Sequence, residues 1–248
     1  MSEHDHEGTV ITDGRAVSTV VGVAVLLGAT VVALGVLTAG IGATIQGNAA
    51  SADVTRAVEA FDALHPVATT GRAEVRMAAT GGHLSGVERD LRVLRNGSVV
   101  RTVAVGGIVY DRRDRRAAFV AGAVVRGPPD GARVVTGPPV IAGDRARTLV
   151  VGTARARPDG AVGIGGSGAT IRTNVSHERT ALGRGRYAVA IETATPNAFE
   201  RWFEARATSV ERRSFDDDGV TSVVARFRGE RTAHLVVHDT SARVGGSG

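Results

Sequence analysis

The chain has 248 residues, of which 43% are hydrophobic and only 4% aromatic, so its core must be built mainly from Val, Ala, Ile and Leu. It contains no cysteine, which excludes a disulfide framework, a lipid-anchored cysteine and thiolate metal sites. The net charge is +5, and every basic residue is Arg. Because the arginines alternate with apolar residues and no stacking aromatics interleave with them, we expect a solvated sheet face and no nucleic-acid partner.

The N-terminal part of the chain carries no charged residue from Ala16 to Ala52. A helix of about 20 residues already spans a hydrocarbon core of about 30 Å, so this run predicts a membrane-spanning helix. A buried core helix would show a polar stripe, and none is present. A cleaved secretory signal ending at Ala50-Ser51-Ala52 is the alternative. Its apolar region is usually only about 7–15 residues and follows a basic start, whereas the leader here is acidic.

Small residues recur in this segment at spacings of four, seven, four and three, which places them near one face of a helix. Such a face lets two helix backbones approach closely in a membrane. The alternative is that Gly is simply common in membrane helices. As a packing seam, this face would contact other helices. The seam residues are Ala24, Gly28, Gly35, Ala39 and Gly42.

Beyond the uncharged run the helical pattern continues with an apolar face, which includes Val54, Ala57 and Phe61, and an opposite polar face. His65-Pro66 ends it, because the residue before proline is disfavoured in the helical region. We therefore predict one helix over residues 17–65, with its second half lying on the following domain.

Residues 66–244 read as a β-rich domain, and residues 245–248 as a flexible tail. Asn96-Gly97 between two apolar runs predicts a type I′ hairpin. Further strands are bounded by Gly, Pro or Asp. They are predicted at Ile108–Tyr110, Ala117–Arg126, Arg133–Thr136, Thr148–Ala156, Ala169–Val175, Tyr187–Thr193, Thr221–Arg228 and Thr232–His238.

One later helix is predicted, with Thr195 as its cap and Pro196 at its first position. Phe199, Trp202 and Phe203 give it an apolar face, which either pins the helix to the sheet or anchors a partner. The expected fold class is therefore α+β: a long N-terminal transmembrane helix, then a mainly antiparallel β domain with one short helix.

Two acceptor sequons for N-linked glycan are present, Asn96-Gly-Ser98 and Asn174-Val-Ser176. We expect Asn96 to be the better exposed of the two, because it lies at a hairpin tip.

The chain offers little that resembles catalytic chemistry. The segment 163–168 is Gly-rich, but a strand follows it where a phosphate loop needs a helix. Asp216–Gly219 lacks the alternating ligands of a calcium loop and reads as a hairpin turn. His234 and His238 share one face of a strand but would be about 13 Å apart, too far for one metal ion. We expect no enzyme, no metal and no cofactor.

Gly14-Arg15-Ala16-Val17, followed at once by the uncharged helix, resembles the prepilin-type (class III) signal of archaeal type IV pilin-like proteins, particularly the haloarchaeal ones. In that family a prepilin peptidase cuts before the helix, after a small residue that follows a charged one. The resemblance implies that Arg15 is the recognised charge, Ala16 the last leader residue and Val17 the first mature residue. Val21 stands where bacterial pilins carry a glutamate, and the domain is basic where haloarchaeal surface proteins are generally acidic.

The resemblance implies a cytoplasmic leader over residues 1–16, a single-pass anchor in the cell membrane and an extracellular C-terminal domain. The expected role is a structural subunit or accessory component of a surface filament, acting in adhesion or assembly. Its expected partners are the membrane, the prepilin peptidase and other pilin-like subunits that bind through the N-terminal helix. The alternative is a stand-alone membrane-anchored module that binds a glycan, a protein or a small ligand.

Overall fold

The computed structural model describes residues 14–64, 71–143, 145, 147–156, 161–165, 168–216, 218–240 and 243–246, with side chains from Val21 onward except at 73 and 243–246. Residues 1–13 of the expected leader, as well as His65 and Pro66 at the expected helix end, lie outside these ranges.

Helix α1 spans Gly14–Ala63 without interruption. It begins before Val17, because nothing in Gly14-Arg15-Ala16 breaks a helix. The chain divides into two compact units, residues 1–48 and 49–248, so the boundary falls inside α1. The last turns of this helix therefore belong to the β-rich unit.

The β-rich unit contains, among the described residues, two sheets and one further helix, α2 (Pro196–Glu204). The fold class is thus α+β, as predicted. The strands are β1 (Gly71–Met77), β2 (His83–Val87), β3 (Asp90–Arg95), β4 (Ser98–Ala104), β5 (Gly107–Arg112), β6 (Arg115–Val120), β7 (Ala123–Arg126), β8 (Arg133–Thr136), β9 (Val140–Gly143), β10 (Thr148–Arg155), β11 (Ala161–Gly163), β12 (Ala169–Glu192), β13 (Ser209–Arg213), β14 (Ser222–Asp239) and β15 (Arg243–Gly246).

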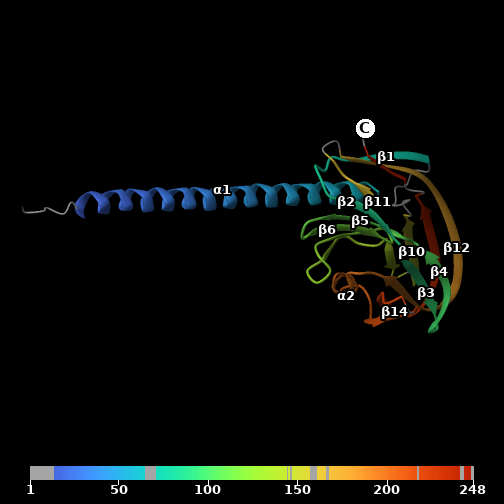
Figure 1. Ribbon diagram of the computed structural model, residues 1–248. Helices are drawn as coiled ribbons and strands as arrows, with labels where there is room; N and C mark the ends of the chain where they lie inside the picture. The colour runs from blue at the N-terminus through green and yellow to red at the C-terminus, as the bar shows by residue number, and fades with distance from the viewer. Residues whose placement is uncertain are drawn as a thin grey trace, which may run out of the picture. The chain divides into compact units, whose positions relative to one another are not determined.

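The smaller sheet has six strands in the order β11-β2-β5-β6-β7-β8. The larger has nine, with a path β4-β3-β12-β14-β10-β9, while β1 and β15 also pair with β12 and β13 pairs with β14. Figure 1 shows β12 as a long curved strand that several others join. Pairing between the named strands is antiparallel except between β10 and β14, which run parallel.

The six-stranded sheet is buried on both faces, which explains why its central strands read as continuous apolar runs. Along β5, Val109 points into the core shared with the nine-stranded sheet, while Ile108 and Tyr110 point into a second core. The end of α1 closes that second core. The β-rich unit therefore has three layers: the end of α1, the six-stranded sheet and the nine-stranded sheet.

The apolar face predicted for the end of α1 is confirmed. Val54, Ala57 and Phe61 are at most 1% exposed and pack in the second core. The rings of Phe61 and Phe119 lie 6.5 Å apart between centroids. This packing holds the last turns of α1 on the six-stranded sheet.

Asp53 is a fully buried carboxylate on this part of α1. Its Oδ2 accepts hydrogen bonds from the backbone N–H (3.1 Å) and the hydroxyl (3.0 Å) of Thr80, and its Oδ1 accepts one from Arg56 at 2.7 Å. Arg112, at the end of β5, forms an ion pair with it. Nearby, the Tyr110 hydroxyl donates to the carbonyl of Gly81, and burial raises the pKa of Tyr110 to about 12, so this donor stays protonated. The bonds from Thr80 fasten α1 to the loop between β1 and β2, and the ion pair with Arg112 fastens it to β5.

The predicted hairpin at Asn96-Gly97 is confirmed, since both residues have positive φ, 53° and 91°. The single strand predicted at Ala117–Arg126 is wrong. A tight turn at Ala121-Gly122, again with both φ values positive (52° and 84°), splits it into β6 and β7. Ala rarely adopts this conformation, so the sequence carries no clear turn signal there.

The two long strands of the larger sheet are each predicted as two shorter ones. Residues 176–186 of β12 are mostly exposed and read as a loop, yet they continue the strand with register shifts near Leu182 and Tyr187. In β14 the strand continues through Gly229 (φ 68°), which lies in the register shift between the pairs Arg186–Glu230 and Ala188–Arg226. Gly245 and Gly246, expected in a flexible tail, pair with β12 as part of β15.

Helix α2 begins at Pro196 as predicted, and Phe199 and Phe203 are buried against the sheets. Thr195 occupies the cap position but its hydroxyl makes no capping bond. It lies 3.1 Å from the hydroxyl of Thr193 instead, so the prediction of a side-chain cap is wrong.

We predict that Asp53→Ala lowers the free energy of unfolding by about 3 kcal/mol, because it removes the buried carboxylate that Thr80, Arg56 and Arg112 share as a hydrogen-bond and ion-pair partner. Chemical denaturation of the full-length protein in detergent micelles measures this loss. The matched control is Glu59→Ala, an exposed acidic residue on the same helix. Equal losses in the two variants would contradict the anchoring role of Asp53.

Candidate functional site

The first half of α1 is a fully exposed apolar rod. It lies within a helix that is long and apolar enough to cross a membrane, with a mean hydropathy of 2.4 in a window that is 0% buried. Its large side chains between Val21 and Ile45 are 53–70% exposed. An apolar surface of this extent in water is unfavourable, so it indicates a single-pass membrane anchor.

The hydroxyl groups on this rod are compatible with lipid. The side chains of Thr30, Thr38 and Thr44 donate hydrogen bonds to the backbone carbonyls of Leu26, Leu34 and Gly40, one turn earlier. Each polar hydrogen is therefore satisfied within the helix, as a hydrocarbon environment requires.

Residues 21–47 of α1 keep Leu and Ile apart from Gly and Ala, while Val21, Val25, Val32 and Val36 share the half that holds Gly and Ala. At about 100° per residue, every Leu and Ile falls within an arc of about 100°, and every Gly and Ala falls within the opposite half of the helix. The bulky face consists of Leu26, Leu27, Leu34, Leu37, Ile41 and Ile45. Small residues permit close backbone contact, so the small half is suited to helix–helix packing and the bulky face to lipid.

The predicted seam of Ala24, Gly28, Gly35, Ala39 and Gly42 occupies an arc of about 60° within the small half. A Cβ added to Gly28, Gly35 or Gly42 would meet no atom of the chain within 4 Å. A second row was missed by sequence reasoning, although the same spacing rule would have found it. The second row consists of Gly22, Ala29, Ala33, Gly40 and Gly47.

Arg15, Ala16 and Val17, the residues of the expected processing site, lie in the first turn of α1. Their backbone is helical and continuous with the rod.

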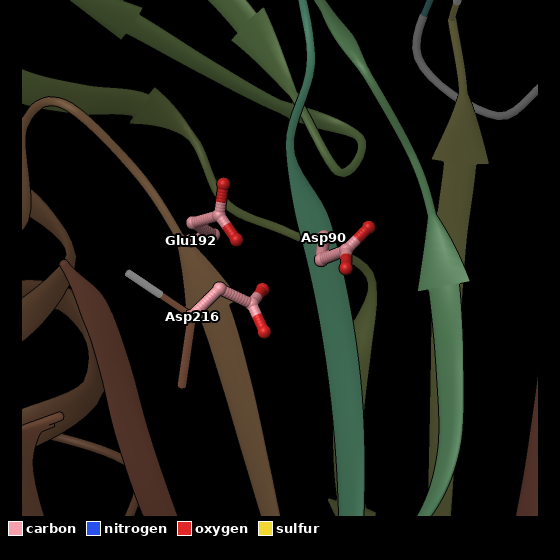
Figure 2. Close-up of side chains that lie close together, drawn as sticks. All are labelled: Asp90, Glu192 and Asp216. Atoms are coloured by element: carbon pink, nitrogen blue, oxygen red, sulfur yellow. The ribbon is translucent and has the colours of Figure 1, made fainter. Parts of the chain in front are cut away.

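Three carboxylates gather on the nine-stranded sheet, on the face turned away from the six-stranded sheet. Figure 2 shows Asp90 on β3, Glu192 on β12 and Asp216 in the loop before β14. One carboxylate oxygen from each residue lies within 4.8 Å of the other two. Three such groups could in principle bind a cation. The cluster was not predicted, because its members lie far apart in the sequence.

The guanidinium of Arg92 occupies the centre of this cluster. It donates hydrogen bonds to Asp90 at 2.9 Å and to Glu192 at 3.1 Å, and it also pairs with Asp216. Phe215 covers the guanidinium, whose carbon lies 5.0 Å from the ring centroid. Burial raises the pKa of Glu192, while the hydrogen bond from Arg92 opposes the rise. The arrangement is therefore best explained as a buried ion-pair network that ties β3, β12 and the β13–β14 loop together.

Both sequon asparagines are exposed. Asn96 lies at the tip of the β3–β4 hairpin, where its side-chain oxygen accepts a hydrogen bond from the backbone N–H of Arg186 at 3.0 Å. Asn174 lies within β12, and its backbone N–H donates to the carbonyl of Thr240 at 3.2 Å. Asn96 therefore belongs to a turn and Asn174 to a strand.

The structure also places the two segments considered as a phosphate loop and a calcium loop. The Gly-rich segment 163–168 leads into β12, so a strand follows it as expected, and residues 166 and 167 lie outside the described residues. Asp216–Gly219 lies in the connection between the paired strands β13 and β14.

A protein-family model described as "Family of unknown function (DUF7289)" matches residues 15–243. No curated protein and no solved structure matches the chain. The match begins at Arg15 and extends through almost the whole β-rich unit, so it covers the anchor and the domain together.

We predict that Arg92→Met lowers the free energy of unfolding by about 3 kcal/mol at pH 7, because it leaves the carboxylate of Glu192 buried without a cation. The loss should shrink toward pH 4. Without Arg92 the pKa of Glu192 rises further above its ordinary value of 4.5, and a raised folded-state pKa favours folding at low pH and loses that contribution as pH rises.

Denaturant titrations of the full-length protein at pH 7 and pH 4 measure this effect, with the exposed Arg101→Met as the matched control. Millimolar Ca²⁺ should leave the Tm of the unmodified protein unchanged. A rise in that Tm would instead identify the cluster as a cation site.

Proposed function

This chain belongs to the family of unknown function DUF7289, and we propose that it is a pilin-like structural subunit, or an accessory component, of a type IV pilus-like filament on an archaeal cell surface. Its role is structural and not enzymatic. The leader is removed by a prepilin peptidase, α1 anchors the protein in the cell membrane, and the β-rich unit lies outside the cell.

This proposal rests mainly on helix α1, which is unbroken. Its first part is an exposed apolar surface, and its last turns are buried in the core of the β-rich unit. Its first part has a small-residue half suited to close helix contacts and a bulky face suited to lipid. Its last turns form part of the domain core through Val54 and Phe61. A helix that both bundles with neighbours and carries its own domain is what a helix-cored filament requires.

The alternative, a stand-alone membrane-anchored binding module, is favoured by one feature of the β-rich unit. A cavity of about 340 Å³ opens beside the start of α2, where Arg89, Asn197 and Arg212 contribute polar groups. Its size suits one small ligand. A monomer in the membrane that binds a defined ligand would support this alternative over the filament subunit.

We predict that the protein isolated from its own membranes begins at Val17. Intact-mass measurement should show the loss of residues 1–16, and Ala16→Phe should retain them, because the peptidase requires a small residue before the cut. The matched control, Ala29→Phe, should still be cleaved. A mature chain that starts at Met1 or at Asp53 would contradict the proposal, and the same spectra show whether Asn96 or Asn174 carries a glycan.

We predict that copies of the chain contact one another through the small half of α1. The chain has no cysteine, so a single introduced cysteine can be crosslinked only at its own position. In membranes treated with a short bis-maleimide, Gly35→Cys and Ala39→Cys should form dimers, because their positions face a neighbouring helix. The matched controls Leu34→Cys and Ile41→Cys, on the bulky face, should remain monomers. Equal crosslinking from both faces would contradict a directed helix contact.

A further inference from the structure

Two histidines from distant parts of the chain face each other on the nine-stranded sheet. His177 of β12 and His238 of β14 are direct cross-strand partners in the antiparallel ladder. Their Nδ1 atoms lie 2.7 Å apart, and their rings meet edge to face with centroids 4.7 Å apart. Both side chains reach the surface. This pair was not predicted, because the sequence suggested only His234 and His238, which lie along a single strand.

We propose that His177 and His238 together bind one divalent transition-metal ion at the surface of the domain. Neutral imidazole is the commonest protein ligand for such ions, and its Nδ1 atom is a suitable donor. The two rings supply two ligands through their Nδ1 atoms, and water completes the coordination. This inference does not depend on the filament role.

The general affinity order of divalent ions indicates which ion binds best. The observed 2.7 Å between the two Nδ1 atoms is a hydrogen-bonding distance, so it shows that the two nitrogens come close together but does not select a coordination geometry. The affinity order places Cu²⁺ first.

Binding a metal ion requires the two rings to reorient. In the structure the two Nδ1 atoms are at hydrogen-bonding distance, so one ring donates to the other. Binding replaces the shared proton with the ion and requires each ring to turn by about 45° toward a common point. Side chains at the surface have room for this rotation, whereas rings packed in a core would not.

Two protein ligands make an open site. Among the described residues, the one group of three or more His, Asp or Glu ligand atoms that lie within 4.8 Å of one another is the Asp90, Glu192 and Asp216 cluster, so the histidine pair counts as two protein ligands. At least two coordination positions therefore remain for water or for a group from another molecule.

The position of the pair gives metal binding a structural consequence. The ladder between β12 and β14 ends one residue further on, at Ser176 and Asp239, and β15 continues the same register along β12 from Arg172–Arg243 to Ala169–Gly246. An ion bridging His177 and His238 would tie β12 and β14 together near the end of their ladder. Binding to the folded state alone raises stability by mass action, so the ion should raise the Tm.

The test is a Cu²⁺ titration of the full-length protein in detergent, purified without a histidine tag. The background carries His4→Gln and His6→Gln, so that the N-terminal histidines do not compete. His177→Gln and His238→Gln are compared with His234→Gln, which changes a histidine on the same strand that pairs with Ala181. Affinity is measured by calorimetry, ligand type by electron paramagnetic resonance, and stability by thermal unfolding.

We expect one Cu²⁺ ion with two imidazole nitrogens in its resonance spectrum and a rise in Tm on binding. His177→Gln and His238→Gln should each weaken binding by at least about tenfold, since loss of even an outer partner of a metal ligand has an effect of that size. His234→Gln should bind as tightly as the background protein. Unchanged affinity in His177→Gln or His238→Gln, or an equal loss in His234→Gln, would overturn the proposal.

Discussion

The buried carboxylate of Asp53 lies near the point where helix α1 changes from an exposed apolar surface to a face that packs in the β-rich unit. It is the first charged side chain after the uncharged run that begins at Ala16, and it is fully buried. Burying a charge is costly unless it is paired and hydrogen-bonded, and here Thr80, Arg56 and Arg112 supply the partners. These bonds fix the position of the last turns of α1 within the β-rich unit.

The surface of helix α1 differs before and after Asp53. Before it, residues 21–45 are apolar except for threonine hydroxyls that are bonded to the backbone, and the separation of Leu and Ile from Gly and Ala distinguishes one face from the other. After it, Val54 and Phe61 are buried beside polar residues on the opposite face. The helix itself is continuous across this point, from Gly14 to Ala63.

The nine-stranded sheet depends on contacts between distant residues. Arg92 joins β3 to β12 and to the loop before β14, and the three acidic partners would repel one another without it. The long pairing of β12 with β14 brings His177 and His238 together in the same way. The two clusters have different chemistry: in the first a buried arginine pairs with three carboxylates, whereas in the second two imidazoles share a hydrogen bond between their Nδ1 atoms.

The sequence by itself determined the features that depend on neighbours a few residues away. These are the apolar rod, the amphipathic turns up to Phe61, the hairpin at Asn96-Gly97 and the start of α2 at Pro196, because helix periodicity and turn residues act locally. Only the tertiary structure decided that Ala121 takes a left-handed turn, that residues 176–186 continue β12, and that His177 meets His238. Strand pairing is set by packing between segments far apart in the chain, and no local pattern encodes which segments those are.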